Sequence, residues 1–281
     1  MTTISITPST AIDRARGAEV FERIVVGIDG SAQALEAARQ AAILADAEGT
    51  LTALAAWSLL PPVVVPFAPQ TPLLDVEQER GSAEAHVAEA AAVAADSHRC
   101  RTRTVQGPGW QGLLDEIARE YATLVAVGAH GSGRFAGLVA GSTATELIHR
   151  APCSVLVARG TPERFPGRIV VGVDGTPQSA RAYATAEVLA ARFDVELWPV
   201  VAHGRDAIDR DRVDAILGPR REDSPDRPTR ALVAASTEAD LLVVGSRGLH
   251  GVRSLGSVSE RVAHQARCST LIVREPGWRS A

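Results

Sequence analysis

The glycine-rich stretch between Leu124 and Ala158 is the part of the chain best suited to hold a ligand. A short apolar run, Leu124 to Val127, predicts a buried strand, and a helical pattern begins near Ser142. Glycines at a strand-to-helix junction let main-chain N–H groups approach a ligand closely, and the first helical turn adds unpaired donors with partial positive charge. Such a junction is suited to bind phosphate.

The spacing of the glycines is specific. Two residues separate Gly128 from Gly131, nine separate Gly131 from Gly141, and Ser142 follows directly. This G-2x-G-9x-G-S pattern between two apolar strands resembles the ATP-binding loop of the universal stress protein family. The resemblance implies that these four residues form a phosphate cradle.

The chain also repeats itself, which predicts two similar domains. RIVVGVD at 168–174 copies RIVVGID at 23–29, and the stretch 241–273 is the partner of the glycine-rich stretch. Alternating strand and helix patterns predict an open parallel sheet with helices on both faces, whose ligand lies outside the carboxyl ends of the strands. Among the connections, Ser31 is the expected N-cap of the first helix, and Thr176 with Pro177 takes its place in copy two.

The duplication resembles tandem universal stress proteins over nearly the whole chain from about residue 22. The resemblance implies an α/β fold of two tandem, open, five-stranded parallel-sheet domains, Rossmann-like and adenine-nucleotide alpha hydrolase-like. It also implies a pseudo-dimer in which the final strands, 154–158 and 269–273, pair across the axis between the domains.

We divide the chain into a mobile tail over 1–20, a first domain over 21–159, a linker over 160–167 and a shortened second domain over 168–281. Copy two is 28 residues shorter, mostly where copy one has a proline-rich loop, 59–75, and a long helix, 77–98. Its third strand, near 220–226, has little apolar character and is expected to be frayed or absent.

Asp29 and Asp174 close the first strand of each copy. By resemblance, the matching aspartate contacts the sugar or base of a nucleoside, a task that suits a carboxylate accepting hydroxyl hydrogen bonds. The alternative is a turn-forming Asp-Gly pair. Ala56 and Val200 align by resemblance with the residue whose backbone reads adenine, and an ordinary core strand is the alternative. Arg134 can reach phosphate or remain solvated.

The predicted nucleotide-binding set covers both copies. It comprises Ile28, Asp29, Gly30, Ala56, Val127, Gly128, Gly131, Arg134, Gly141, Ser142 and Thr143, and in copy two Asp174, Val200, Gly245, Gly248, Gly256, Ser257, Val258 and Ser259.

The second cradle departs from the family pattern. Seven residues separate Gly248 from Gly256, where the family has nine, so about 6 Å of reach is lost. That site is expected to be tighter, shifted or empty. Ser142 is also a candidate N-cap, and Thr143 with Glu146 has the spacing of a capping box, as has Ser257 with Glu260.

Composition excludes several classes of function. A net charge of −4 and a pI near 6.0 argue against a nucleic-acid surface. The absence of lysine excludes a P-loop. No secretory leader or membrane-length apolar run is present, so we expect a cytoplasmic protein without membrane contact.

Cys153 and Cys268 are expected to be buried thiols, and the cysteines show no metal-ligand spacing. No histidine has the setting of a general base. His149 and His264 lie near helix C-termini, where the dipole favours imidazolium.

The resemblance implies an ATP-binding regulatory protein of stress response or dormancy, not an enzyme, with Mg²⁺ accompanying the nucleotide. ADP and AMP are left open as ligands. Hydrolysis is expected to be slow or absent, because the loop lacks a water-positioning carboxylate. A protein partner and a further homodimer are left open. The alternatives are an ATPase or nucleotidyl transferase on the same fold, and a nucleotide-free scaffold.

Overall fold

The structure is a computed structural model that describes residues 21–58, 76–94, 99–131, 141–202, 210–218, 222–246 and 258–279. The expected tail over 1–20 and the proline-rich loop over 59–75 lie outside the described residues.

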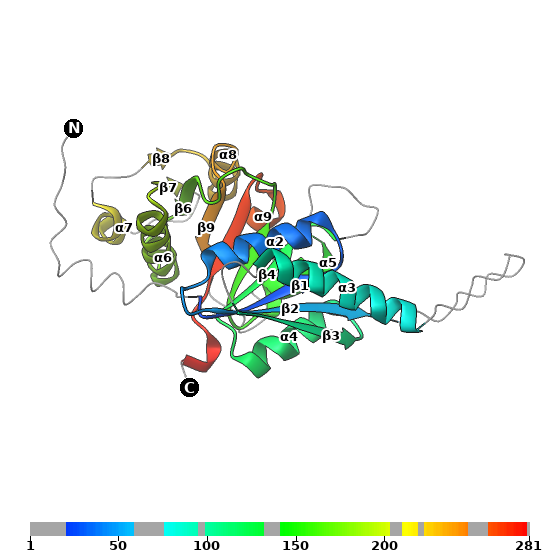
Figure 1. Ribbon diagram of the computed structural model, residues 1–281. Helices are drawn as coiled ribbons and strands as arrows, with labels where there is room; N and C mark the ends of the chain where they lie inside the picture. The colour runs from blue at the N-terminus through cyan, green and yellow to red at the C-terminus, as the bar shows by residue number, and fades with distance from the viewer. Residues whose placement is uncertain are drawn as a thin grey trace, which may run out of the picture.

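One ten-stranded sheet runs through both halves in the order β3-β2-β1-β4-β5-β10-β9-β6-β7-β8 (Figure 1). Every pair within a half is parallel, and β5 and β10 join the halves antiparallel. The expected fold class and the pairing of the final strands are confirmed. The strands are β1 Arg23–Ile28, β2 Thr50–Trp57, β3 Arg99–Gln106, β4 Leu124–Gly128, β5 Ser154–Ala158, β6 Arg168–Gly172, β7 Glu196–Ala202, β8 Glu222–Ser224, β9 Leu241–Gly245 and β10 Ser269–Val273.

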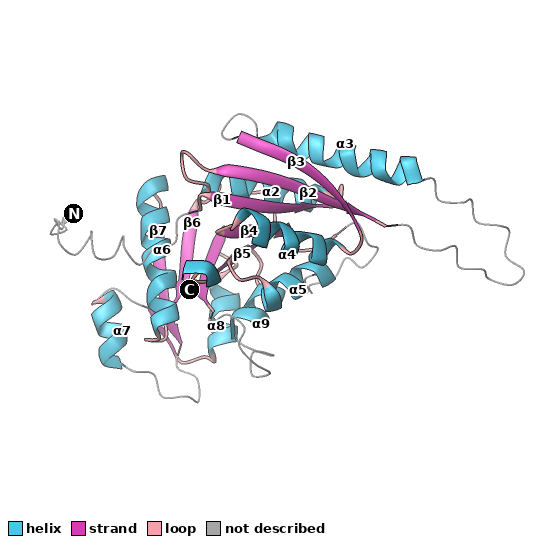
Figure 2. Ribbon diagram, turned by 90° about the horizontal axis from the view of Figure 1, so that it is seen from below, coloured by secondary structure: helices cyan, strands magenta, loops and turns pink. Residues whose placement is uncertain are grey.

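Helices cover both faces of the sheet (Figure 2). One core contains buried residues of α2, α3, α6 and α7, and the other contains those of α4, α5, α8 and α9. The helices are α2 Ala32–Leu44, α3 Val76–Ala94, α4 Gly109–Glu120, α5 Ser142–Arg150, α6 Pro177–Phe193, α7 Arg210–Leu217, α8 Pro228–Ala235 and α9 Val258–Gln265, and a 3₁₀ turn, η2, spans Gly277–Arg279.

Local signals place the first helix of each half as expected. Ser31 caps α2 by accepting a hydrogen bond from Ala34 N, and Thr176 caps α6 by accepting one from Ser179 N, both at 3.2 Å. Pro177 occupies the first turn of α6, where its missing N–H costs nothing. Both helices therefore begin three residues after the aspartate that follows the first strand of their half.

The third strand of the second half is present but short. β8 has three residues and pairs with β7 only from Val200 to Ala202. Pro199 precedes that segment on β7 and has no N–H to donate. By contrast, β3 pairs with β2 over eight residues, Thr50 to Trp57.

The two halves meet along strands that are entirely buried. All residues of β5 and β10 are buried, and Leu156 pairs with Leu271 at the centre of the ladder. Cys153 and Cys268 are buried as expected, and burial raises the pKa of each thiol to about 12. These thiols are therefore structural.

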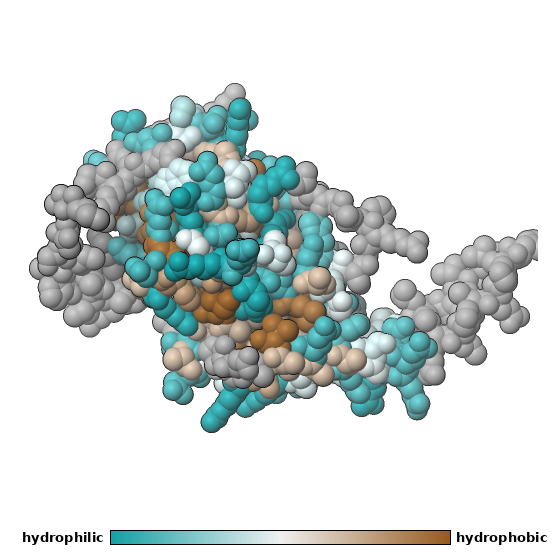
Figure 3. Space-filling model, turned by 45° about the horizontal axis from the view of Figure 1, so that its top comes forward, coloured by the Kyte–Doolittle hydropathy of each residue, from teal (hydrophilic) through white to brown (hydrophobic). Residues whose placement is uncertain are grey.

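Polar side chains cover much of the face of the molecule that Figure 3 shows. In the view of Figure 3, apolar side chains form small patches between polar ones. The described helices include none with the length and apolar character needed to cross a membrane.

Helices α5 and α9 face each other across the junction through histidine and glutamate. His149 Nε2 lies 2.9 Å from Glu260 Oε1, although it is not aligned as a hydrogen-bond donor. Burial lowers the pKa of His264, Glu260 opposes this shift, and Arg159 and His149 add to it. At His264 burial is the largest of these effects, and the net shift of the pKa is downward.

This shift predicts a pH-dependent stability. The native state binds a proton at His264 less readily than the unfolded chain does, so the protein loses stability as pH falls through about 6.5. His264→Gln should lose less stability than the wild type between pH 7.5 and 5.5, as measured by urea unfolding at each pH. Parallel losses in both proteins would contradict the prediction.

Candidate functional site

A cavity of about 840 Å³ opens at the carboxyl ends of β1, β2 and β4. β1 and β4 are neighbours in the sheet, although α2, β2, α3, β3 and α4 lie between them in the chain. The strand order therefore reverses at this point. The volume falls in the usual range for small-molecule sites. The lining residues are Gly27, Ile28, Asp29, Ala34, Leu54, Ala56, Ser58, Gly107, Pro108, Gly109, Leu113, Val127, Gly128, His130, Gly131, Gly141, Ser142, Thr143 and Ala144.

Strand order divides the cavity into three parts. Asp29 follows β1 in the middle. On one side lie Leu54 and Ala56 of β2 with the turn 107–109 before α4, and this wall is largely apolar. On the other side lie Gly128, Gly131 and Gly141, with the first turn of α5. An elongated ligand with an apolar end and an anionic end matches this arrangement.

Hydrogen bonds fix the base of the glycine loop. Ala129 N donates to Ala158 O at 2.9 Å, and Gly141 N donates to Ala129 O at 2.7 Å. His130 N donates to the side-chain oxygen of Gln33 at 2.9 Å. The loop therefore returns to its starting point, and α5 begins beside the end of β4.

The three glycines of the motif serve different purposes. A Cβ on Gly128 would lie 2.9 Å from the main chain of Gln33, so this glycine lets α2 pack against β4. A Cβ on Gly131 would lie 2.6 Å from Asp29 Oδ2. At Gly141 the nearest described atoms would lie 3.8 Å from a Cβ, and its φ of −62° suits any residue. Packing among the described residues therefore does not require glycine at position 141.

The N-cap residue of α5 supplies no side-chain acceptor to the first turn of the helix. Gly141 is the N-cap and makes no side-chain hydrogen bond, which corrects the expectation that Ser142 caps the helix. Ser142 and Thr143 are the first two helical residues, so Thr143 and Glu146 do not form a capping box. The first N–H groups of a helix have no partner within it, and here Ser142 and Thr143 line the cavity. Glycine at the N-cap position has no side-chain oxygen that could accept hydrogen bonds from those donors.

Asp29 has a role in the fold as well as a place in the cavity. Its Oδ1 accepts hydrogen bonds from Ser31 N at 3.0 Å and from Ser31 Oγ at 2.6 Å. Its Oδ2 faces Gly131. The turn-forming interpretation therefore holds for Oδ1, and the Oδ2 side borders the space where a ligand would lie.

The structure brings most of the predicted first-half set together. Ile28, Asp29, Ala56, Val127, Gly128, Gly131, Gly141, Ser142 and Thr143 all line the cavity. Gly30 does not, and a Cβ there would instead overlap the ring of His86 from α3. Arg134 lies outside the described residues.

The second half repeats the aspartate turn. Asp174 Oδ1 accepts hydrogen bonds from Thr176 N at 3.0 Å and Thr176 Oγ1 at 2.6 Å, the same distances as in the first half. Ser259 is buried in the first turn of α9, which starts at Val258. A Cβ on Gly245 would overlap the main chain of Gln178, so β9 and α6 approach closely. Gly248, Gly256 and Ser257 lie outside the described residues.

Val200 is not the counterpart of Ala56. Gly27 pairs with Leu54, and its repeat partner Gly172 pairs with Val200, so Val200 matches Leu54 and the counterpart of Ala56 is Ala202. The alignment was wrong by two positions. Because side chains alternate with a period of two, such a slip keeps every apolar residue on its face and leaves no trace in the pattern.

Sequence reasoning missed one wall of the cavity. The turn Gly107-Pro108-Gly109 and Leu113 of α4 line it, and none of them was selected. Their position after a predicted parallel strand was the available signal, because the carboxyl ends of all parallel strands share one edge of the sheet.

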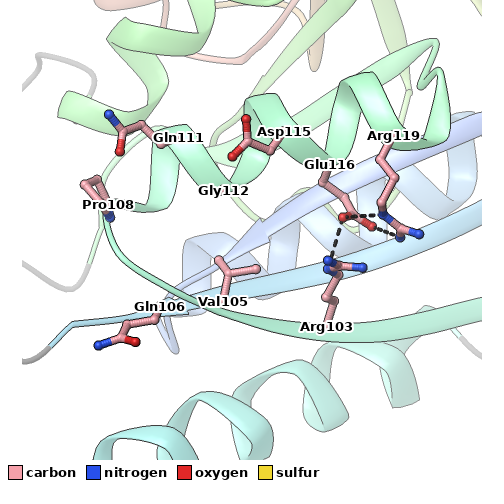
Figure 4. A pocket seen from close by; sticks show the side chains of 9 residues that line it. All are labelled: Arg103, Val105, Gln106, Pro108, Gln111, Gly112, Asp115, Glu116 and Arg119. Atoms are coloured by element: carbon pink, nitrogen blue, oxygen red, sulfur yellow. Dashed lines mark hydrogen bonds and ion pairs between the residues drawn. The ribbon is translucent and has the colours of Figure 1, made fainter.

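A second, smaller hollow of about 200 Å³ lies between β3 and α4 (Figure 4). Glu116 is buried there and pairs with Arg103 at 3.1 Å and with Arg119. Both guanidinium groups are thus bound to one carboxylate of the protein. The hollow is accordingly a less suitable anion site than the cavity. Among the described residues, no cluster of His, Cys, Asp or Glu side chains could hold a metal ion.

Fold and site together define an α/β protein with helices on both faces of a largely parallel sheet and a ligand-sized cavity at a point of strand-order reversal. The model of the universal stress protein family matches residues 21–159 and 217–274. The chain is 31% identical to the universal stress protein Rv2623 of Mycobacterium tuberculosis over 90% of this chain and 96% of that protein. It is also 31% identical to a universal stress protein of Mycolicibacterium smegmatis, over 89% and 96%.

Solved structures agree on the fold. A universal stress protein from Archaeoglobus fulgidus superposes with a TM-score of 0.67 at 18% identity, covering 90% of this chain and 96% of that one. The chain belongs to the universal stress protein family.

The repeated aspartate turns predict equal contributions to stability. Ser31→Ala and Thr176→Ala each remove an N-cap and a partner of the aspartate, so each should cost about 1 kcal/mol of unfolding free energy. Urea unfolding of the two variants measures this. A loss in only one variant would show that the turns are not energetically equivalent.

Proposed function

We propose that this chain is a cytoplasmic regulatory protein of the stress response that binds ATP, accompanied by Mg²⁺, in the cavity of its first half. The phosphates would lie against the amides at the start of α5 and the glycines after β4, the sugar beside Asp29, and the base against the apolar wall of β2 and the turn before α4. The observation that carries the proposal is the first turn of α5, which lines a ligand-sized cavity and follows an N-cap glycine that packing among the described residues does not require.

The residues present fit such a ligand. The cavity volume suits a nucleotide, and N–H groups at a helix N-terminus favour anions through both hydrogen bonds and the helix dipole. Mg²⁺ usually binds through substrate phosphates and one or two carboxylates, and Asp29 supplies a carboxylate at the right place. The choice among ATP, ADP and AMP would follow from how many phosphates the loop accepts.

Gly141→Ser tests this proposal because it should affect folding and binding in opposite directions. Serine is a good N-cap, so the variant should be at least as stable as the wild type. Its side chain would occupy the cradle and accept from the amides needed by phosphate, so the affinity for ATP should fall about tenfold or more. Isothermal titration calorimetry with Mg²⁺ and ATP measures the affinity.

Gly81→Ala is the matched control, because a Cβ at this position in α3 has no atom within 4 Å. It should also preserve or raise stability, yet leave ATP binding unchanged. A wild type that binds no ATP, or a Gly141→Ser variant that binds it normally, would exclude the proposed site.

Hydrolysis should be slow. Asp29 is the one carboxylate among the described residues that line the cavity, and its Oδ1 is engaged by Ser31. No second carboxylate among those residues is placed to orient an attacking water. Phosphate release from saturating ATP should stay below about 1 s⁻¹, and faster steady turnover would favour an enzyme.

A further inference from the structure

In each half, the last strand is followed by an arginine whose side chain reaches a helix of the other half. Arg159 follows β5 and Arg274 follows β10. The Arg274 guanidinium donates from Nη1 to Ala151 O at 2.8 Å and from Nη2 to Ile148 O, both at the end of α5. Arg159 donates from Nη1 to a carbonyl oxygen at 2.8 Å and from Nη2 to another at 3.1 Å, both near the end of α9. The two contacts are reciprocal across the junction.

Serine hydroxyls hold the main chain of each arginine. Arg274 N donates to Ser154 Oγ at 3.1 Å, and Ser154 Oγ lies 3.3 Å from Arg274 O. Arg159 N donates to Ser269 Oγ at 2.9 Å, and Ser269 Oγ lies 3.1 Å from Arg159 O. Both arginines are therefore fixed at the antiparallel β5–β10 ladder before their side chains reach the opposite helix.

Arg274 supplies hydrogen-bond donors to carbonyl groups at the C-terminal end of α5. The last carbonyl groups of a helix have no partner within it, and the C-terminal end of a helix favours a cation. Arg274 is only 4% exposed, so the carbonyls that it reaches receive donors in a buried setting. Burial lowers the pKa of Arg274 to about 10, which leaves the guanidinium charged at neutral pH. The C-terminal end of α5 is thus held by the second half.

The opposite end of α5 lines the side of the cavity to which the proposed function assigns the phosphates. The helix has nine residues and is about 13 Å long, so it behaves as a short rigid rod. A displacement at its C-terminal end moves the N–H groups of its first turn, and binding sites lose affinity when such groups shift by about 1 Å.

We propose that Arg274, from the second half, is a positioning residue for the phosphate end of the first-half nucleotide site. The inference rests on the proposed function, and it adds that the site is complete only when both halves are joined. Arg159 holds α9 in the same manner and does not contact α5 through its guanidinium hydrogen bonds. The pair therefore offers a matched comparison.

The test compares Arg274→Gln with Arg159→Gln. Both variants lose a guanidinium that donates two hydrogen bonds to the end of a helix, buried at Arg274 and partly buried at Arg159, so both should lose stability. Only Arg274→Gln should also weaken ATP binding at the site that Gly141→Ser impairs, by about tenfold, with the affinity for adenosine changed less than about twofold. Adenosine lacks phosphate, so a change confined to ATP separates a shift of α5 from general loosening. Equal effects of the two variants on ATP, or no effect of Arg274→Gln, would overturn the proposal.

Arg274→Lys and Arg159→Lys serve if the glutamine variants do not fold. Lysine keeps the charge but lacks the planar pair of donors, so Arg274→Lys should weaken ATP about threefold relative to Arg159→Lys. Hydrogen exchange without nucleotide gives a second readout. The Thr145 amide, bonded to Gly141 O at 3.0 Å, should exchange faster in Arg274→Lys than in Arg159→Lys.

These readouts separate the two proposals. If the wild type binds no ATP but Thr145 exchanges faster only in Arg274→Lys, the proposed function fails while the positioning of α5 by Arg274 stands. If ATP binds to the wild type and the two lysine variants behave alike in both measurements, the positioning role of Arg274 fails and the proposed function survives.

Discussion

The antiparallel pairing of β5 with β10 is the contact on which the rest of the molecule depends. Both strands are buried along their whole length, and either one alone would be an apolar sheet edge. Joining them converts two parallel sheets into one continuous sheet of ten strands. It also places Arg159 and Arg274 against the helices of the opposite half, so the same ladder that covers the edges anchors α5 and α9.

The candidate site follows from the geometry of a parallel sheet. The carboxyl ends of β1, β2 and β4 point the same way, so loops that are distant in sequence meet at one edge. Hydrogen bonds from Ala129 and Gly141 then bring the end of β4 and the start of α5 together. The first turn of α5 and the Asp29 carboxylate therefore line one cavity, in a chain without lysine.

The two halves share the aspartate turn but differ in the walls around it. Asp29 and Asp174 hold the residue two positions on at identical distances, because the turn is set by local residues that the repeat preserves. The outer strands differ because Pro199 limits what β7 can pair with, whereas β2 pairs with β3 along its full length. The aspartate turns of the two halves are therefore more alike than their outer strands.

The sequence by itself determined the elements, the duplication and the glycine spacing, because periodicity, caps and turn residues act within a few neighbouring positions. Ser31 and Thr176 cap their helices as their residue types predict, and most of the predicted first-half residues line one cavity. Only the tertiary structure decided which distant segments meet. It set the β7 register that moves Val200 away from the position of Ala56, and it added the turn 107–109 to the cavity. It also brought the Arg274 side chain to the C-terminal end of α5. Contacts between segments that are far apart in the chain leave no local pattern in the sequence.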